Sequence, residues 1–65
     1  MKIMRLGEVM NITGLGRSSI YKLMAEGLFP KSIPLAARSV GWLEQEIDDW
    51  ILARVAARNR SGARI

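Results

Sequence analysis

The chain has 65 residues, enough for one domain over residues 1–65 whose core supplies only about 3–5 kcal/mol. It has no cysteine and no histidine, so disulfides are excluded and the usual general base and zinc ligand are missing. We therefore expect no enzyme, no cofactor, no metal site and no small-molecule substrate.

The net charge of +4 favours a polyanionic partner. No apolar stretch approaches the ~20 residues that span a bilayer, and residues 1–4 are too short for a signal peptide, so we expect a cytoplasmic protein without membrane contact.

Two short helices joined by a tight turn are predicted first. Residues 7–13 keep apolar residues at helical spacing, and Gly14 after them suits a left-handed helix end. The second helix covers residues 17–26 and is ended by Gly27. One of its sides is apolar, and the other carries small polar, aromatic and basic groups. Leu15 is the natural anchor in the turn between them, and the pair has the outline of a helix-turn-helix.

The segment over residues 29–42 cannot be a continuous helix, because it contains Pro30 and Pro34. Two short strands can pair across a connection formed by residues 35–38, namely Lys31–Ile33 and Ser39–Trp42. Gly41 is a candidate for a bulge in the second strand.

The last predicted helix covers residues 43–58 and is followed by a basic tail, residues 59–65. Its helical spacing is kept by Leu43, Ile47, Trp50, Ile51 and Val55. Its first half carries the acids Glu44, Glu46, Asp48 and Asp49, and its end carries the bases Arg54 and Arg58. The helix dipole favours this order of charges. Pairing with the dipole explains the acids better than a divalent-metal site does. The predicted core comprises Ile20, Leu23, Met24, Trp42, Ile47, Trp50 and Ile51.

A helix-turn-helix whose second helix exposes hydrogen-bonding groups predicts binding to double-stranded DNA, because the major groove admits one helix. Arg17 at the start of that helix suits either a guanine edge or a phosphate. Further candidate DNA contacts on the same helix are Ser18, Ser19, Tyr21 and Lys22, although Tyr21 suits packing against the hairpin equally well.

The chain resembles the AlpA family of phage and prophage regulators over roughly residues 4–58. The runs that carry the resemblance are Arg5-Leu6-Gly7-Glu8-Val9, Thr13-Gly14-Leu15-Gly16-Arg17-Ser18-Ser19-Ile20-Tyr21, Glu26-Gly27-Leu28-Phe29-Pro30-Lys31, Arg38-Ser39-Val40-Gly41-Trp42-Leu43-Glu44 and Glu46-Ile47-Asp48-Asp49-Trp50. The resemblance implies a mainly α fold of three helices with a small β-hairpin, a winged helix-turn-helix of the MerR and excisionase type. It also implies a regulator that binds near a prophage promoter or attachment site.

By position, the resemblance makes residues 17–26 the recognition helix and residues 31–42 the wing, with Arg38 at its tip. Lys31, Arg38 and Ser39 of the wing are then further candidate DNA contacts. The chain departs from the family pattern twice. Gly16 replaces a serine that would cap the recognition helix, at a cost of a few tenths of a kcal/mol, and Ala36-Ala37 replace glycine or proline near the wing tip.

The sequence leaves other functional hypotheses open. An excisionase-like architectural factor would bend DNA and direct a recombinase, whereas an activator would have RNA polymerase as partner. A protein-interaction module, for instance an anti-repressor, would dock through apolar residues left exposed, such as Leu28, Phe29 or Leu52. A homodimer or cooperative binding to repeated sites would raise affinity, although no heptad zipper is present. The bases near the end, of which Arg54 and Arg58 are candidate DNA contacts, suit a solvated helix end equally well, as do Arg60 and Arg64.

Overall fold

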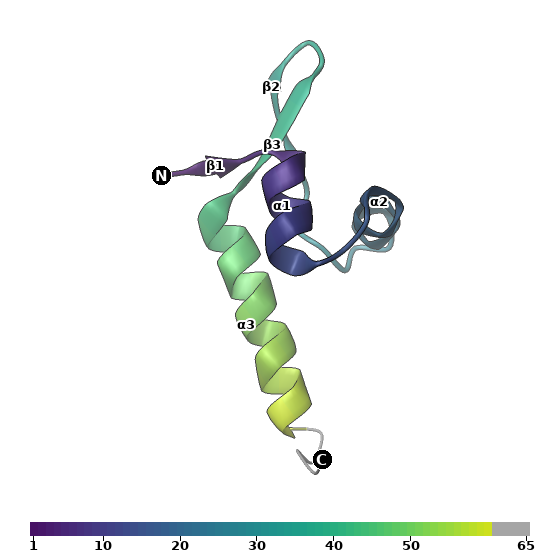
Figure 1. The fold of residues 1–65 in the computed structure, drawn as a ribbon, viewed down its shortest axis with the longest axis vertical. Coiled ribbons are helices and arrows are strands. Elements are labelled where there is room, and N and C mark those ends of the chain that lie inside the picture. The colour runs from purple at the N-terminus through teal and green to yellow at the C-terminus, as the bar shows by residue number, and fades with distance from the viewer. Residues whose placement is uncertain (61–65) are drawn as a thin grey trace.

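The computed structural model of the protein describes residues 1–60, which form three helices and a three-stranded antiparallel sheet (Figure 1). In chain order the elements are β1 (Ile3–Met4), α1 (Leu6–Thr13), α2 (Arg17–Ala25), β2 (Ile33–Ala36), β3 (Ser39–Leu43) and α3 (Glu44–Arg60). The mainly helical winged helix-turn-helix class is confirmed, with the β2–β3 hairpin as the wing. The expected basic tail is divided, since residues 59 and 60 end α3 while residues 61–65, Arg64 among them, lie outside the described residues.

Glycines end both helices of the helix-turn-helix. Gly14 follows α1 with a φ of 76°, the left-handed conformation expected there. Gly27 follows α2 with a φ of 73°. Its N–H and that of Leu28 donate to the carbonyls of Met24 and Leu23 at 3.1 and 2.8 Å, which is the Schellman arrangement. Each helix therefore differs from its predicted range by only one residue at one end.

The turn between α1 and α2 is held by local hydrogen bonds and one apolar anchor. The Thr13 hydroxyl donates to the Val9 carbonyl at 2.7 Å and accepts the N–H of Leu15 at 3.2 Å. The Leu15 side chain is half-buried against the core, in the anchoring position expected for it. Gly16, at the start of α2, provides no side-chain cap. The turn thus sets the angle at which α2 leaves α1.

The first strand was not predicted. In the sheet order β1-β3-β2, Ile3 pairs with Leu43 and Met4 with Trp42. The prediction that Leu43 begins the last helix is wrong, because the residue is held in β3 by its partner Ile3. The last helix starts one residue later, where the Glu44 N–H donates to the Lys2 carbonyl at 2.9 Å.

The hairpin lies further along the chain than predicted. Its first strand is Ile33–Ala36 rather than Lys31–Ile33, and Ala36 pairs with Ser39, so that only residues 37 and 38 form the turn. The irregularity in pairing falls on β2 at Leu35, between Pro34 and Ala36, and the bulge expected at Gly41 is wrong. The edge position of β2 accommodates Pro34, whose missing N–H would disrupt an inner strand.

Gly41 serves close packing instead of a bulge. A Cβ at this position would overlap the Ile3 side chain and lie 3.1 Å from both a Leu35 methyl and the Met4 carbonyl oxygen. The absence of a side chain therefore lets β1 and the Leu35 side chain both close over β3. This steric requirement is what selects glycine in the middle of the hairpin.

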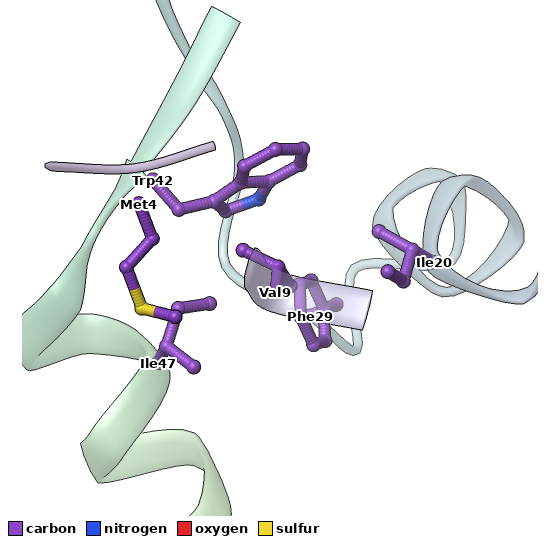
Figure 2. Close-up of a cluster of buried hydrophobic side chains, with 6 residues drawn as sticks. All are labelled: Met4, Val9, Ile20, Phe29, Trp42 and Ile47. Carbon is purple, nitrogen blue, oxygen red and sulfur yellow. The ribbon is translucent and has the colours of Figure 1, made fainter. Parts of the chain in front are cut away.

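One small apolar core joins all the elements except β2. Its buried members are Met4, Val9, Ile20, Phe29, Trp42 and Ile47 (Figure 2). The predicted core is confirmed for Ile20, Trp42 and Ile47, while the other predicted members are half-buried against it: Leu23, Met24, Trp50 and Ile51. The suggestion that Phe29 stays exposed is wrong, since the ring is only 5% exposed, whereas Leu28 and Leu52 are exposed at 60% and 63%.

Two indole groups fix the segment that leads from α2 to the hairpin. The Trp42 Nε1–H donates to the Pro30 carbonyl at 3.0 Å, and the Trp50 Nε1–H donates to the Leu28 carbonyl at 2.8 Å. Between them, the Phe29 ring meets the Trp50 ring edge to face, with centroids 4.8 Å apart. These contacts explain why Phe29 is buried, and they hold α2 at a set position relative to β3 and α3.

Helix α3 has 17 residues, about 25 Å of length, and extends well past α1 on the side away from the hairpin (Figure 1). Only its first turns face the core, so Val55 is exposed at 38% although it continues the apolar spacing. No helix within residues 1–60 has the length and apolar character needed to cross a membrane.

Candidate nucleic-acid interface

The exposed side of α2 carries five of the ten residues predicted to contact DNA. Successive residues of a helix are rotated by about 100°, and Ile20 marks the side that faces the core. Ser18 and Lys22 therefore lie outermost, and Ser19 lies on one shoulder of the helix. Arg17 and Tyr21, one turn apart, share the other shoulder. All the residues named here except Ile20 are exposed.

A cleft of about 460 Å³ lies between the start of α1, the Arg17–Tyr21 shoulder of α2 and the hairpin. We call it the basic cleft; it is lined by Arg5, Leu6, Gly7, Arg17, Tyr21, Arg38 and Val40. Three of these residues are arginines from three separate parts of the fold, and no acidic side chain lines the cleft in the described part of the chain. The surroundings therefore favour an anionic ligand.

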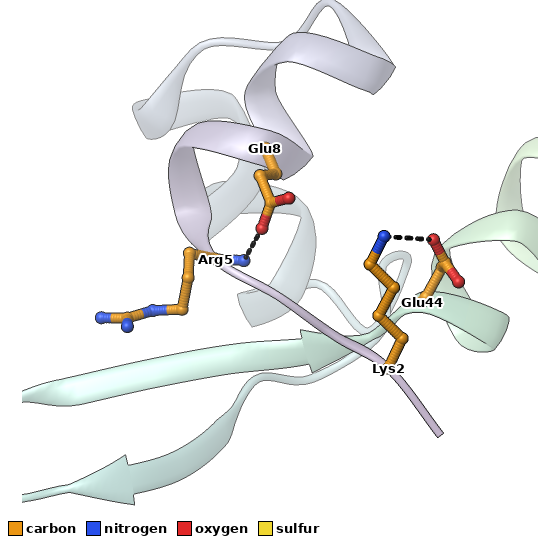
Figure 3. Close-up of polar contacts among 4 residues, drawn as sticks. All are labelled: Lys2, Arg5, Glu8 and Glu44. Atoms are coloured by element: carbon orange, nitrogen blue, oxygen red, sulfur yellow. Dashed lines mark hydrogen bonds and ion pairs between the residues drawn. The ribbon is translucent and has the colours of Figure 1, made fainter.

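Arg5 is the cleft residue that sequence reasoning missed as a candidate contact. Its backbone N–H donates to the Glu8 carboxylate at 3.0 Å, and its side-chain Nε–H donates to the Val40 carbonyl at 3.2 Å. The guanidinium points away from Glu8 along the hairpin (Figure 3). Arg5 is thus held by its backbone and by its Nε, which leaves the two terminal amino groups of the guanidinium for a ligand.

The predicted contacts from the wing are only partly brought together. Arg38 lies in the hairpin turn and lines the basic cleft, next to Ser39, which is half-buried at the start of β3. Lys31 is exposed in the segment before β2 and does not line the cleft. Tyr21, for which packing against the hairpin had equal weight, lines the cleft and remains 42% exposed.

A second hollow, of about 380 Å³, lies at the other end of α1. We call it the apolar groove; it is lined by Ile12, Thr13, Leu15, Trp50, Ile51, Arg54, Val55 and Arg58. The Arg54 guanidinium lies 5.6 Å from the centre of the Trp50 ring, and Arg58 donates to the Asn59 side-chain oxygen at 3.1 and 3.2 Å. The structure therefore separates Arg54 and Arg58 from the arginines of the basic cleft.

The first acid of α3 lies beside the residue before β1, and none of the α3 acids within residues 1–60 lines the basic cleft. The Glu44 carboxylate forms an ion pair of 3.7 Å with the Lys2 ammonium, and both side chains are exposed (Figure 3). An exposed pair of this kind contributes about 0–1 kcal/mol. The ion pair adds to the backbone bond between the same two residues and helps fix the start of α3 on the sheet.

The chain is similar in sequence to known proteins. The family model described as prophage CP4-57 regulatory protein (AlpA) matches residues 2–55. The uncharacterized protein ORF88 of Enterobacteria phage P4 is 41% identical over 59 residues, which cover 91% of this chain and 67% of the phage protein. The DNA-binding transcriptional activator AlpA of Escherichia coli is 39% identical over 59 residues, which cover 82% of this chain and 84% of the activator. The chain belongs to the AlpA family of prophage regulatory proteins.

Proposed function

We propose that this protein is a sequence-specific regulator of transcription that binds double-stranded DNA in the cytoplasm. Helix α2 enters the major groove, and the hairpin contacts the flanking backbone. The observation that carries the proposal is the placement of the exposed, hydrogen-bonding face of α2 beside a cleft that, within residues 1–60, is lined by three arginines and by no acid. The similarity to a DNA-binding transcriptional activator of Escherichia coli supports it.

The dimensions and chemistry of α2 suit the major groove. A helix with its side chains is about 10–12 Å across, and the groove is ~12 Å wide. Ser18 and Lys22, which lie outermost, are the first side chains to meet base edges. Arg17 at the start of the helix is long enough to bond guanine in bidentate fashion or to bind a phosphate. Ser19, on the far shoulder, is expected to meet the backbone on the side away from the hairpin.

The hairpin supplies sequence-independent contacts in this proposal. Arg38 in the turn lines the cleft, Ser39 follows it at the start of β3, and Lys31 precedes the first strand. Contacts of this kind bind phosphates and set the register of α2 without reading bases. Each neutralised phosphate adds about 0.9 to the slope of log affinity against log salt.

Selection of the purified protein on a random duplex pool, followed by binding to the enriched duplex at two salt concentrations, tests the proposal. We expect an enriched motif and a steep loss of affinity with salt. Lys31→Ala should weaken all duplexes alike and reduce the salt slope by about 1, while leaving the motif unchanged. Absence of binding at low salt would overturn the proposal and favour a protein-interaction module, for which the exposed Leu28 and Leu52 would be the first surface to examine.

The regulatory role within this proposal is transcriptional activation, with RNA polymerase as further partner. A circular-permutation assay on the selected duplex distinguishes this role from an excisionase-like one, because a strong bend on binding indicates an architectural factor that directs a recombinase. The symmetry of the selected motif, together with the mass of the complex by analytical ultracentrifugation, reports whether the protein binds as a homodimer or as copies on repeated sites.

A further inference from the structure

We propose that the basic cleft binds one phosphodiester of the DNA strand that separates the two grooves, and that Arg5 is the main ligand of this phosphate. This inference rests on the proposed function and adds a residue outside α2 and the hairpin to the interface. It follows from the position of the cleft, from its charge, and from the way in which Arg5 is held.

The position of the cleft dictates which part of DNA meets it. The cleft has α2 on one side, the hairpin on another and the start of α1 at its floor. In a duplex, the sugar-phosphate backbone separates the major from the minor groove. When α2 lies in the major groove and the hairpin lies on the other side of the adjacent strand, the backbone of that strand runs between them. The cleft is therefore the part of the protein that faces this backbone.

The charges converge on that strand. Arg5, Arg17 and Arg38 reach the cleft from the residue before α1, the start of α2 and the hairpin turn, respectively. Guanidinium groups match phosphate oxygens by two parallel hydrogen bonds, and an anion between them also relieves their mutual repulsion. Within residues 1–60 the nearest acid along α1, Glu8, is directed to the backbone N–H of Arg5 and does not line the cleft.

Arg5 differs from the other two arginines in being held in place. Its Nε–H bond to the Val40 carbonyl orients the guanidinium, whereas no hydrogen bond or ion pair holds the Arg17 or Arg38 side chain within residues 1–60. An oriented side chain loses less conformational entropy when it binds its ligand. Arg5 is therefore the ligand expected to contribute most to the phosphate contact.

The test combines Arg5→Gln with duplexes that carry one neutral methylphosphonate, moved along each strand of the selected site. With wild-type protein, we expect one position at which the neutral linkage weakens binding about tenfold. With Arg5→Gln, binding to the unmodified duplex should fall about tenfold, the salt slope should fall by about 1, and the same methylphosphonate should have a much smaller effect than it has with wild-type protein. The selected motif should stay unchanged, because a phosphate carries no sequence information.

Arg60→Gln, at the far end of α3, is the matched control for the loss of one positive charge. Equal behaviour of the two variants, with no phosphate position sensitive to Arg5→Gln, would overturn the inference while leaving DNA binding itself intact. Should Arg5→Gln fail to fold, Arg38→Gln carries the same test, because its side chain lies in the exposed turn. Because Arg5 is intact in that variant, the methylphosphonate effect should be reduced but not lost, and an unreduced effect together with an unchanged salt slope would contradict a phosphate site in the cleft.

Discussion

The two ends of α1 adjoin hollows of opposite character. At its start, the basic cleft gathers Arg5, Arg17 and Arg38 beside Leu6, Tyr21 and Val40, whereas at its end the apolar groove holds Arg54 and Arg58 among Trp50 and other apolar side chains. Arg54 packs its guanidinium against the Trp50 ring, while Arg17 and Arg38 lie open. Arginine content therefore does not distinguish the two hollows; the neighbours of each arginine do.

The two hollows share one core, and removing its centre should abolish both. Trp42 is fully buried and its indole bonds the Pro30 carbonyl. Trp42→Ala should cost about 3–5 kcal/mol, as much as the whole core of so small a domain supplies, so the variant should be unfolded at room temperature. Circular dichroism during urea titration measures this. A folded, cooperative Trp42→Ala variant would show that the helices are held together by other contacts.

Arg17→Ala should reveal the function of the cleft side of α2. Loss of Arg17 should cost about 1–3 kcal/mol on the selected duplex; a guanine contact would also relax the preference at one base position, whereas a phosphate contact would lower the salt slope by about 1. Fluorescence anisotropy on the selected duplex and on single-base variants measures both effects. Arg58→Ala in the apolar groove is the matched change, and it should alter affinity much less. If Arg17→Ala left affinity and preference unchanged, the assignment of α2 as recognition helix would be wrong.

Trp50→Phe should separate stability from binding on the apolar side. The change keeps a ring against Phe29 but removes the hydrogen bond from the indole to the Leu28 carbonyl. We expect a loss of about 0.5–1.5 kcal/mol in the free energy of unfolding. Affinity for the selected duplex should remain that of the wild type when it is measured well below the unfolding temperature. A marked loss of affinity in the folded variant would mean that the apolar groove takes part in DNA binding.

Two glycines, one at each end of α1, sharpen the contrast further. Gly14 has a φ of 76°, so Gly14→Ala should cost about 1–2 kcal/mol of stability.

Gly7 has open space around its missing Cβ, so Gly7→Ala should gain about 0.5–1 kcal/mol in helix stability. Because Gly7 lines the basic cleft, the added methyl should nevertheless weaken DNA binding a few-fold. Thermal unfolding and anisotropy together check this, and a Gly7→Ala variant that binds more tightly would contradict a ligand in the cleft.

Periodicity predicted the three helices, because each repeats its apolar residues at a regular interval, whereas the hairpin was predicted from the two prolines and from the family resemblance. The first strand escaped prediction, since Ile3 and Met4 are too few to show alternation, and only their pairing with Leu43 and Trp42 makes them a strand. The same pairing explains why Leu43 ends β3 although its spacing fits the last helix. The role of Gly41 also escaped prediction, because it depends on β1: the Ile3 side chain closes over the glycine.

The residues of the candidate site that lie on one helix could be predicted from the sequence. The way in which distant segments come together at the site could not. Arg17 and Tyr21 were found because α2 is amphipathic, and the structure places both in the basic cleft. Arg5 gave no signal of its own, because it is far along the chain from Arg17 and Arg38 and only the fold brings the three together. Phe29 was one of three apolar residues suggested to stay exposed, and its burial against Trp50 is a tertiary contact.

In the proposed interface, DNA binding depends on where the positive charges lie and not on their number. The most direct test compares two double variants that each lose two charges, Arg17→Gln with Arg38→Gln against Arg58→Gln with Arg60→Gln, on the selected duplex over a range of salt concentrations. We predict that the first pair loses most of the affinity and about 2 from the salt slope, while the second stays close to wild type. Equal losses in the two double variants would contradict the claim and would make net charge alone the basis of binding.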